Sequence, residues 1–519
     1  MADDSPAWYV TSALSALAAY ENAEALRYQG RSISYRELLA TVHRTARFLE
    51  RRGLRRGQGI VLVSRNRPEA FAIRLAAHLL GLRYTPVFPD TVADADGLRH
   101  LLTDAQATAL VSDLEIGPVA DLARSAGVPL VFSLVDLMAV AEGESDEPVP
   151  VRTEEGDIAR ILYTGGTTGR PKGVPATFAG LGASTKAWAA SAGSAGSLPE
   201  GTRFLLTTPF AHGSGDAALN TLRLGASVEI MDGFDPAEFV AAVHDAPAAI
   251  TYLYPSWLYR LLDHTEATGA DLTSLKFVMY GSSPIAPARL RQALERLGPG
   301  LMQTYATTEA PAIATLQPAD HAAALTGRPE LLASVGRPMP GVTVTLRRTD
   351  GTTPPPGEVG EVCVQGPGVM TEYWNRPDDL RQTVLPDGRL RTGDLGRFDD
   401  GYLYLVGRLK DMIIVDGYNH YAGTIEDVLT EHPAVREAAV IGVPDERTGE
   451  AIHAFVTVRP PGITPDTLRA WASDHLPTDA VPITITVLDD LPLTPLGKPD
   501  KKALRARAAS TTRSAMTET

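Results

Sequence analysis

The chain of 519 residues has little cysteine and no long apolar run. Its single cysteine, Cys363, excludes an intramolecular disulfide and a cysteine-rich metal site. Because no run of about 18 apolar residues occurs, the sequence predicts no membrane-spanning helix. Residues 1–6 are acidic and lack the apolar segment of a secretory signal, so we expect a cytoplasmic protein.

Positive charge is scarce as well. The 48 lysines and arginines face 62 aspartates and glutamates, which gives a formal net charge of −14. This balance argues against nucleic acid or an anionic membrane as the main partner. Only seven of the basic residues are lysines, and three of these, Lys172, Lys410 and Lys498, fall in the motifs described below.

What the chain does have is an ordinary globular composition, with 44% hydrophobic and 21% charged residues. Its length permits two or more domains. Residues 34–50 have helical spacing behind the N-cap candidate Ser34, and strand-like segments at 59–64 and 84–88 flank a helix-like one at 70–82. The strand–helix–strand order predicts a parallel sheet.

The pattern changes along the chain, and it predicts an α/β fold with two domains. A large N-terminal domain, residues 1–408, is expected to combine α/β subdomains with a β-rich subdomain at about 335–408, where short strands and Gly/Asp turns occur. Residues 412–506 predict a small, mobile α+β domain, joined by a hinge at 409–411. The Ala- and Arg-rich end, 507–519, predicts a loose tail.

The most informative stretch, residues 163–174, reads Tyr-Thr-Gly-Gly-Thr-Thr-Gly-Arg-Pro-Lys-Gly-Val. Glycines let the backbone turn tightly and direct its N–H groups inward, while hydroxyls and a lysine add further donors. Such a loop suits a triphosphate, and the flanking segments predict the tip of a β-hairpin. The candidate phosphate contacts are Thr164, Gly165, Gly166, Thr167, Thr168, Gly169 and Lys172. The stretch is not a Walker A loop, which needs Gly-Lys-Ser/Thr at the start of a helix, and a Gly-rich turn without a ligand is the simpler alternative.

Three further motifs carry residue types suited to nucleotides. Residues 305–309 read Tyr-Ala-Thr-Thr-Glu, and a hydroxyl beside a carboxylate can hold phosphate and Mg²⁺. Asp394 follows a Gly turn and can accept from ribose hydroxyls, and Arg408, 14 residues later, can reach ribose or phosphate. Residues 493–498 end in Gly-Lys. Alone, each motif is also explained by a helix start, a turn or an exposed lysine.

Taken together and in this order, the four motifs resemble those of the adenylate-forming superfamily, which includes acyl- and aryl-CoA ligases, adenylation domains of peptide synthetases and firefly luciferase. The resemblance covers roughly residues 34–504. It implies that a carboxylate attacks the α-phosphorus of ATP, with Mg²⁺ present, to give acyl-AMP and pyrophosphate. The chain departs from the usual pattern at Gly165, where serine is common, and at Ala306, where glycine is common.

The resemblance also implies a role for each motif residue. Tyr305 would stack on adenine, Thr308 would touch the α-phosphate and Glu309 would hold the metal. Asp394 and Arg408 would bind the ribose.

The same resemblance makes Lys498 the catalytic candidate, bridging the carboxylate and the α-phosphate. Lys410 would be the hinge about which the small domain swings between the two half-reactions. The nucleotide contacts would also include Gly281, Ser282 and Ser283.

The pocket for the acid is expected at residues 209–212, Ser214, residues 254–257 and 280–283, and the residues after Glu309. His212 matches a position where the superfamily often has an aromatic residue or histidine beside the carboxylate, although a buried structural histidine is as simple an interpretation. No aspartate of the kind that holds an α-ammonium group is found at the entrance. These residues favour an aryl or medium acyl acid.

The acceptor has several alternatives. CoA is the first, but Ala422 stands where CoA ligases commonly have proline, and the Asn-His-Tyr of residues 419–421 resembles acyl-AMP ligases that load carrier proteins. Relatives in secondary metabolism use an amine, or activate nitrite for diazotisation. A degenerate nucleotide-binding regulator is the alternative from another class, and intact Lys498, Glu309 and Asp394 argue against it.

Overall fold

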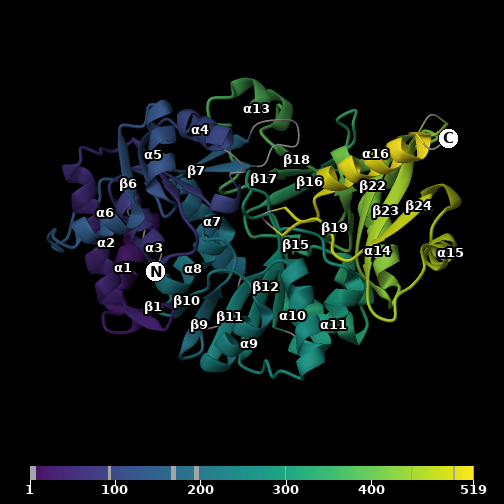
Figure 1. Ribbon diagram of the computed structural model, residues 1–519, viewed down its shortest axis with the longest axis horizontal. Coiled ribbons are helices and arrows are strands. Elements are labelled where there is room, and N and C mark those ends of the chain that lie inside the picture. Colours follow the sequence, from purple (N-terminus) through teal and green to yellow (C-terminus); the bar gives the residue numbers. More distant parts are fainter. Residues whose placement is uncertain are drawn as a thin grey trace.

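The computed structural model describes residues 7–91, 95–164, 171–191, 198–298, 300–445, 447–494 and 497–517. Two large sheets and their helices form the left and lower parts of the molecule, and the small C-terminal unit lies at the right (Figure 1). The predicted fold class, a large α/β domain with a β-rich part and a small α+β domain, is confirmed.

The first large sheet carries the phosphate-loop hairpin at one edge. Its strand order is β6-β5-β3-β4-β7-β8, and all neighbours are parallel except the last pair. The strands are β3 (Gly59–Val63), β4 (Arg83–Val87), β5 (Ala107–Ser112), β6 (Leu130–Ser133), β7 (Ile158–Thr164) and β8 (Lys172–Thr177). The helices of this region are α1 (Trp8–Ala19), α2 (Tyr35–Arg51), α3 (Pro68–Leu79), α4 (Ala95–Asp104), α5 (Ile116–Ser125), α6 (Leu134–Ala141) and α7 (Phe178–Ser191).

The second large sheet has the order β15-β14-β13-β12-β11-β9-β10-β1-β2, with a parallel centre and antiparallel ends. Its strands are β1 (Glu24–Tyr28), β2 (Arg31–Ser34), β9 (Thr202–Leu206), β10 (Ser227–Ile230), β11 (Ala248–Leu253), β12 (Leu275–Gly281), β13 (Leu301–Tyr305), β14 (Ala314–Leu316) and β15 (Arg337–Pro338). Its helices are α8 (Gly213–Arg223), α9 (Pro236–Asp245), α10 (Pro255–Thr268), α11 (Pro287–Leu297) and α12 (Pro318–Thr326).

Two smaller sheets follow in the chain. An antiparallel sheet consists of β16 (Thr343–Arg347), β17 (Gly360–Gln365), β18 (Leu390–Asp399) and β19 (Tyr402–Arg408), with α13 (Pro377–Thr383) inserted. The C-terminal unit contains β20 (Met412–Val415), β21 (Tyr418–Tyr421), β22 (Val435–Asp445), β23 (Gly449–Val458), β24 (Thr484–Leu488), α14 (Ala422–Glu431), α15 (Pro465–His475) and α16 (Lys501–Thr517).

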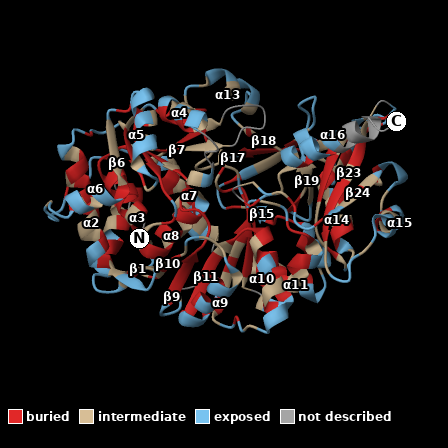
Figure 2. Ribbon diagram, in the orientation of Figure 1, coloured by how far each residue is buried: buried red, intermediate tan, exposed pale blue. Residues whose placement is uncertain are grey.

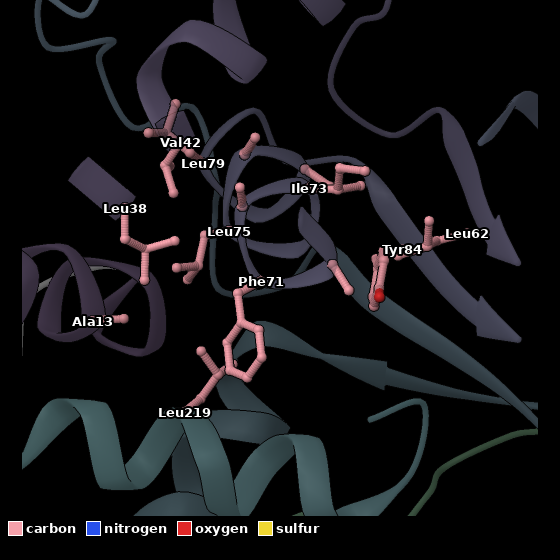
Figure 3. Close-up of a cluster of buried hydrophobic side chains, with 14 of the residues drawn as sticks. Ala13, Leu38, Val42, Leu62, Phe71, Ile73, Leu75, Leu79, Tyr84 and Leu219 are labelled. Atoms are coloured by element: carbon pink, nitrogen blue, oxygen red, sulfur yellow. The ribbon is translucent and has the colours of Figure 1, made fainter. Parts of the chain in front are cut away.

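Local sequence explains how the core between the first two sheets is built. Helix α2 begins as predicted, since Ser34 accepts from the backbone N–H of Glu37 and the Glu37 carboxylate accepts from that of Ser34. Helix α3 is mostly apolar and buries all its residues except Glu69 (Figure 2). Its Phe71 and Leu75 pack among side chains of α1, α2 and α8 (Figure 3).

The structure corrects one expectation, the loose tail at 507–519. Helix α16 continues through this segment to Thr517. Alanine and arginine are strong helix formers, and the four-residue spacing of Leu504 and Ala508 places both on one face. Both are buried against apolar side chains of β22 and β23. One of these two packing residues, Ala508, therefore lies within the segment that was expected to be a loose tail.

Replacing Leu504 by alanine should destabilise the C-terminal unit. The side chain is 0% exposed, and the loss of a buried leucine costs about 2–5 kcal/mol. Hydrogen exchange of the β22 and β23 amides would measure the change in opening free energy. Lys502→Ala, at an exposed position of the same helix, is the matched control and should leave protection unchanged. Equal protection in both variants would contradict the packing of α16.

Candidate active site

The described ends of the phosphate loop form the predicted hairpin. Strands β7 and β8 pair antiparallel, with Thr164 opposite Lys172. Position 173, at the base of the loop, favours glycine because a Cβ there would lie 2.9 Å from Ile161 Cγ2 and 3.1 Å from Trp374 Cβ. The loop residues outside the described part of the chain are Gly165, Gly166, Thr167, Thr168 and Gly169.

Lys172 and Glu309 lie on either side of one tyrosine. The ammonium of Lys172 is 5.2 Å from the ring centre of Tyr373 and 3.2 Å from Oδ2 of Asp379. The hydroxyl of Tyr373 donates to Oε1 of Glu309 at 3.0 Å. The structure therefore links the two predicted site residues through Tyr373, while Asp379 pairs with Lys172 alone. Neither Tyr373 nor Asp379 carries a local sequence signal, and both were missed.

The predicted ribose pair is formed by adjacent strands. Asp394 on β18 lies opposite Arg408 on β19, and Arg408 Nε donates to Asp394 Oδ1 at 2.7 Å. The other oxygen, Oδ2, accepts from the hydroxyl of Tyr305 at 2.7 Å. Burial, and then the charge of Asp394, raise the pKa of Tyr305, so the phenol stays protonated. Gly393 has a φ of 73°, the left-handed region that favours glycine.

Lys498 reaches this region from the C-terminal unit. The preceding residue, Gly497, packs on the start of α10, where its carbonyl accepts from Ser256 Oγ at 2.9 Å. A Cβ at Gly497 would lie 2.9 Å from Tyr254 Cδ2, and its φ is 69°. Lys498 keeps solvent access, yet partial burial and then the charges of Arg408 and Lys410 lower its pKa, against the opposing effect of Asp394. Lys498 is thus held close to the predicted ribose pair.

The expected hinge is a single short turn. Residues Leu409–Asp411 form a 3-10 helix between β19 and β20, and Lys410 is at its centre. Burial, followed by the charge of Arg408, lowers the pKa of Lys410. Asp411 is paired with Arg505 at 2.9 Å.

His212 caps the start of α8 and is close to two cations. Its Nε2 is buried and has no hydrogen-bond partner among the residues that the structure describes. Burial, followed by the charges of Arg160 and Lys498, lowers the pKa of His212 to about 4. The imidazole is therefore neutral near pH 7 and available to a ligand.

A buried ion cluster fixes α8 behind His212. The carboxylate of Asp216 accepts from Arg160 at 2.8 and 2.9 Å and also pairs with the buried Arg74 of α3. Burial alone would raise the pKa of Asp216, but Arg160 and Arg74 lower it well below its usual range. Sequence reasoning did not find this cluster, because its residues come from α3, β7 and α8.

The remaining predicted residues are Thr308, Gly281, Ser282 and Ser283. Thr308 borders a small internal cavity of about 20 Å³ beside Arg160. A Cβ on Gly281 would lie 2.4 Å from the carbonyl oxygen of Thr304, so only glycine fits. Ser282 has a φ of 71°, unusual for a residue with a side chain, and is hydrogen bonded to Tyr252 at 2.9 Å. The half-buried Ser283 follows.

A cleft of about 660 Å³ opens beside these groups. Its wall combines Glu309 and Tyr373 with Gly393 and Arg408, and it includes the last turn of α13. Within the described ranges, no group of three or more His, Cys, Asp or Glu side chains could hold a metal by itself. No helix in that part of the chain is long and apolar enough to cross a membrane.

Comparison with known proteins agrees with this geometry. A family described as AMP-binding enzyme matches residues 15–374, and one described as AMP-binding enzyme C-terminal domain matches residues 424–498. The medium/long-chain-fatty-acid–CoA ligase FadD8 of Mycobacterium tuberculosis is 37% identical over 485 residues, covering 87% of this chain and 81% of that protein. The fatty acid–[acyl-carrier-protein] ligase ScoC of Streptomyces coeruleorubidus is 32% identical, covering 92% of each.

A solved structure shows the same fold. The amide bond synthetase McbA from Marinactinospora thermotolerans superposes with a TM-score of 0.86 at 37% identity, covering 96% of this chain and 99% of that one. The three proteins are 32–37% identical to this chain but differ in the acceptor that their names state. The family resemblance inferred from the four motifs is thereby confirmed: the chain belongs to the AMP-binding enzymes, the adenylate-forming superfamily, and is an ATP-dependent, AMP-forming ligase that activates an acid.

Proposed function

We propose that the protein converts a small aryl or acyl carboxylic acid into acyl-AMP with release of pyrophosphate, and then transfers the acyl group to CoA. The observation that carries this proposal is the position of Lys498. Its loop packs on α10, and its pKa responds to Arg408 and Asp394 while it perturbs that of His212. These contacts support the inference that the C-terminal unit brings this lysine to the place where a carboxylate and ATP would meet.

The reaction needs concentrated positive charge, because two anions must approach each other and negative charge develops on the departing pyrophosphate. Lys498 would bridge the carboxylate and the α-phosphate, and Lys172 would hold the outer phosphates with Thr164 and the rest of the loop. Thr308 would contact the α-phosphate. The protein's own part is to align these groups for in-line attack.

Nucleotide recognition is assigned to the opposite wall of the cleft. Asp394, held by Tyr305 and Arg408, presents a fixed carboxylate to the ribose hydroxyls. Adenine would lie against Tyr305 and the turn of Gly281, Ser282 and Ser283. Residues 409–411 would form the hinge, with Lys410 absorbing the rotation of the C-terminal domain.

Glu309 is the proposed Mg²⁺ residue, and its surroundings fit that ion. Oε1 accepts from Tyr373, and within the described part of the chain Oε2 has no hydrogen bond. Mg²⁺ usually keeps several waters and takes one or two carboxylates plus substrate phosphates, so a single glutamate suffices. The ion would neutralise charge on the phosphates.

The acid would be oriented by His212. A neutral imidazole with a buried, unpartnered Nε2 can hydrogen bond to a carboxylate, and its low pKa keeps a further positive charge from competing with Lys498.

Two other acceptors have support. ScoC is named for transfer to an acyl carrier protein and McbA for amide bonds, so a carrier protein or an amine is the second candidate acceptor. Activation of nitrite, as in secondary metabolism, is a variant of this second proposal. A regulator without catalysis is disfavoured, since Asp394, Glu309 and Lys498 are all present, Glu309 lines the cleft, and Asp394 affects the pKa of Lys498.

Replacing Lys498 by alanine should abolish adenylate formation while sparing transfer from supplied acyl-AMP. Losing a charge that acts on the developing negative charge should lower kcat for pyrophosphate release by about 100-fold or more. The two half-reactions would be measured separately, with Lys502→Ala as the control of equal charge change on the same domain. Equal loss of both half-reactions in Lys498→Ala would contradict the assignment.

The imidazole of His212 should titrate near pH 4 rather than near 6.5, the ordinary pKa of histidine. Between these values the unfolded chain binds a proton at this site and the folded protein does not, so His212 lowers the stability as pH falls from about 6.5 to 4. NMR titration would measure the pKa, with His212→Gln identifying the signal. A midpoint at or above 6.5 would show that the site does not desolvate the ring.

Pyrophosphate release should occur with some aliphatic or aryl acids and not with α-amino acids. A panel of acids, including nitrite, would be assayed with CoA, with a carrier protein, with an amine and with none of them. CoA-dependent thioester product supports the first proposal, whereas product formed only with a carrier protein or an amine replaces it by the second. No release with any acid would support the regulator.

A further inference from the structure

Tyr373 is the residue through which the phosphate hairpin and Glu309 are joined. Its hydroxyl donates to Glu309 Oε1 at 3.0 Å, and its ring lies under the ammonium of Lys172 at 5.2 Å. No motif predicted a role for it. The inference developed here rests on the proposed function, because it concerns the metal and phosphate groups of that site.

The backbone around Tyr373 is anchored on both sides. Three residues earlier, the N–H of Met370 donates to the carbonyl of Glu309 at 2.8 Å. One residue later, the N–H of Trp374 donates to the carbonyl of Gly173 at 2.9 Å, and its indole N–H donates to the carbonyl of Asp104 at 2.7 Å. The segment thus holds the hairpin and the Glu309 loop at a set separation, with Tyr373 between them.

The side chain is suited to orient both charges. Tyr373 is 7% exposed, so its contacts are shielded from water. The donor on Oε1 limits the rotation of the Glu309 carboxylate, which lines the cleft, and the negative face of the ring attracts the lysine.

We propose that Tyr373 is a positioning residue that orients the Glu309 carboxylate for Mg²⁺ through its hydroxyl and the Lys172 ammonium for the phosphates of ATP through its ring. The hydroxyl of Tyr373 contacts Glu309, and its ring contacts Lys172. Tyr373→Phe removes the first and keeps the second, whereas Tyr373→Leu removes both. This separation makes the proposal testable by binding, without relying on turnover.

The test measures Mn²⁺ binding by electron paramagnetic resonance, in the presence of an ATP analogue with a methylene group between the α- and β-phosphates. Y373F should weaken Mn²⁺ binding on the order of 10-fold, because removing a hydrogen-bond partner of a metal-ligating carboxylate typically has that effect. Its affinity for the analogue alone should change by less than about twofold. Y373L should weaken the analogue too, by about threefold.

Tyr402→Phe is the matched control. Its hydroxyl also donates to a carboxylate, that of Asp320, at 2.7 Å, and the residue is 4% exposed, but it does not line the cleft. Y402F should bind Mn²⁺ and the analogue as the unaltered protein does. Thermal unfolding of both phenylalanine variants would show that each is folded.

Glu309→Gln separates this inference from the proposed function. If E309Q binds Mn²⁺ normally, the assignment of the metal to Glu309 fails. If E309Q loses Mn²⁺ while Y373F is unchanged, the proposed function stands and the role of Tyr373 is overturned. If the double variant is no weaker than E309Q, the effect of Tyr373 is transmitted through Glu309, as proposed.

Discussion

The close contact between Gly497 and the start of α10 is the constraint on which the site depends. Lys498 belongs to the small C-terminal unit, whereas Arg408 and Asp394, which shift its pKa, belong to β19 and β18. The loop can approach only because its preceding residue has no side chain, since a Cβ would collide with Tyr254. Asp394 opposes the effect of Arg408 and Lys410 on the pKa of Lys498, and the carboxylate and phosphates of the substrates would supply further anionic partners.

The carboxylates of Asp216 and Asp394 each have two partners, whereas that of Glu309, among the residues that the structure describes, accepts a hydrogen bond on one oxygen only. Asp216 is bound by two arginines, and Asp394 has both oxygens occupied by Arg408 and Tyr305. Removing one partner of a buried ion pair leaves an uncompensated charge, which lowers the stability of the fold by about 3–5 kcal/mol. These two carboxylates are therefore expected to keep their positions. Glu309 accepts from Tyr373 on one oxygen only and therefore retains capacity for a metal.

Much of the architecture could be predicted because it follows from local patterns. The capping box at Ser34, the hairpin around the phosphate loop and the pairing of Asp394 with Arg408 all involve residues close in the chain or on consecutive strands. The cluster around Asp216 could not be predicted, because arginines that pair inside a core are not distinguished in sequence from arginines on the surface. Helix α16 was missed since its buried face is sparse within an Ala- and Arg-rich segment.

By itself, the sequence determined the class of chemistry and the α/β order of the chain, since short motifs and hydrophobic periodicity depend on neighbouring residues. Only the tertiary structure decided which charges meet. Tyr373 joins Lys172 to Glu309, and Gly497 brings Lys498 beside α10 through a hydrogen bond from Ser256, 241 positions earlier in the chain. The pKa shifts of these groups, including the low pKa of His212, depend on burial among those distant residues. Burial is a property of the folded chain alone.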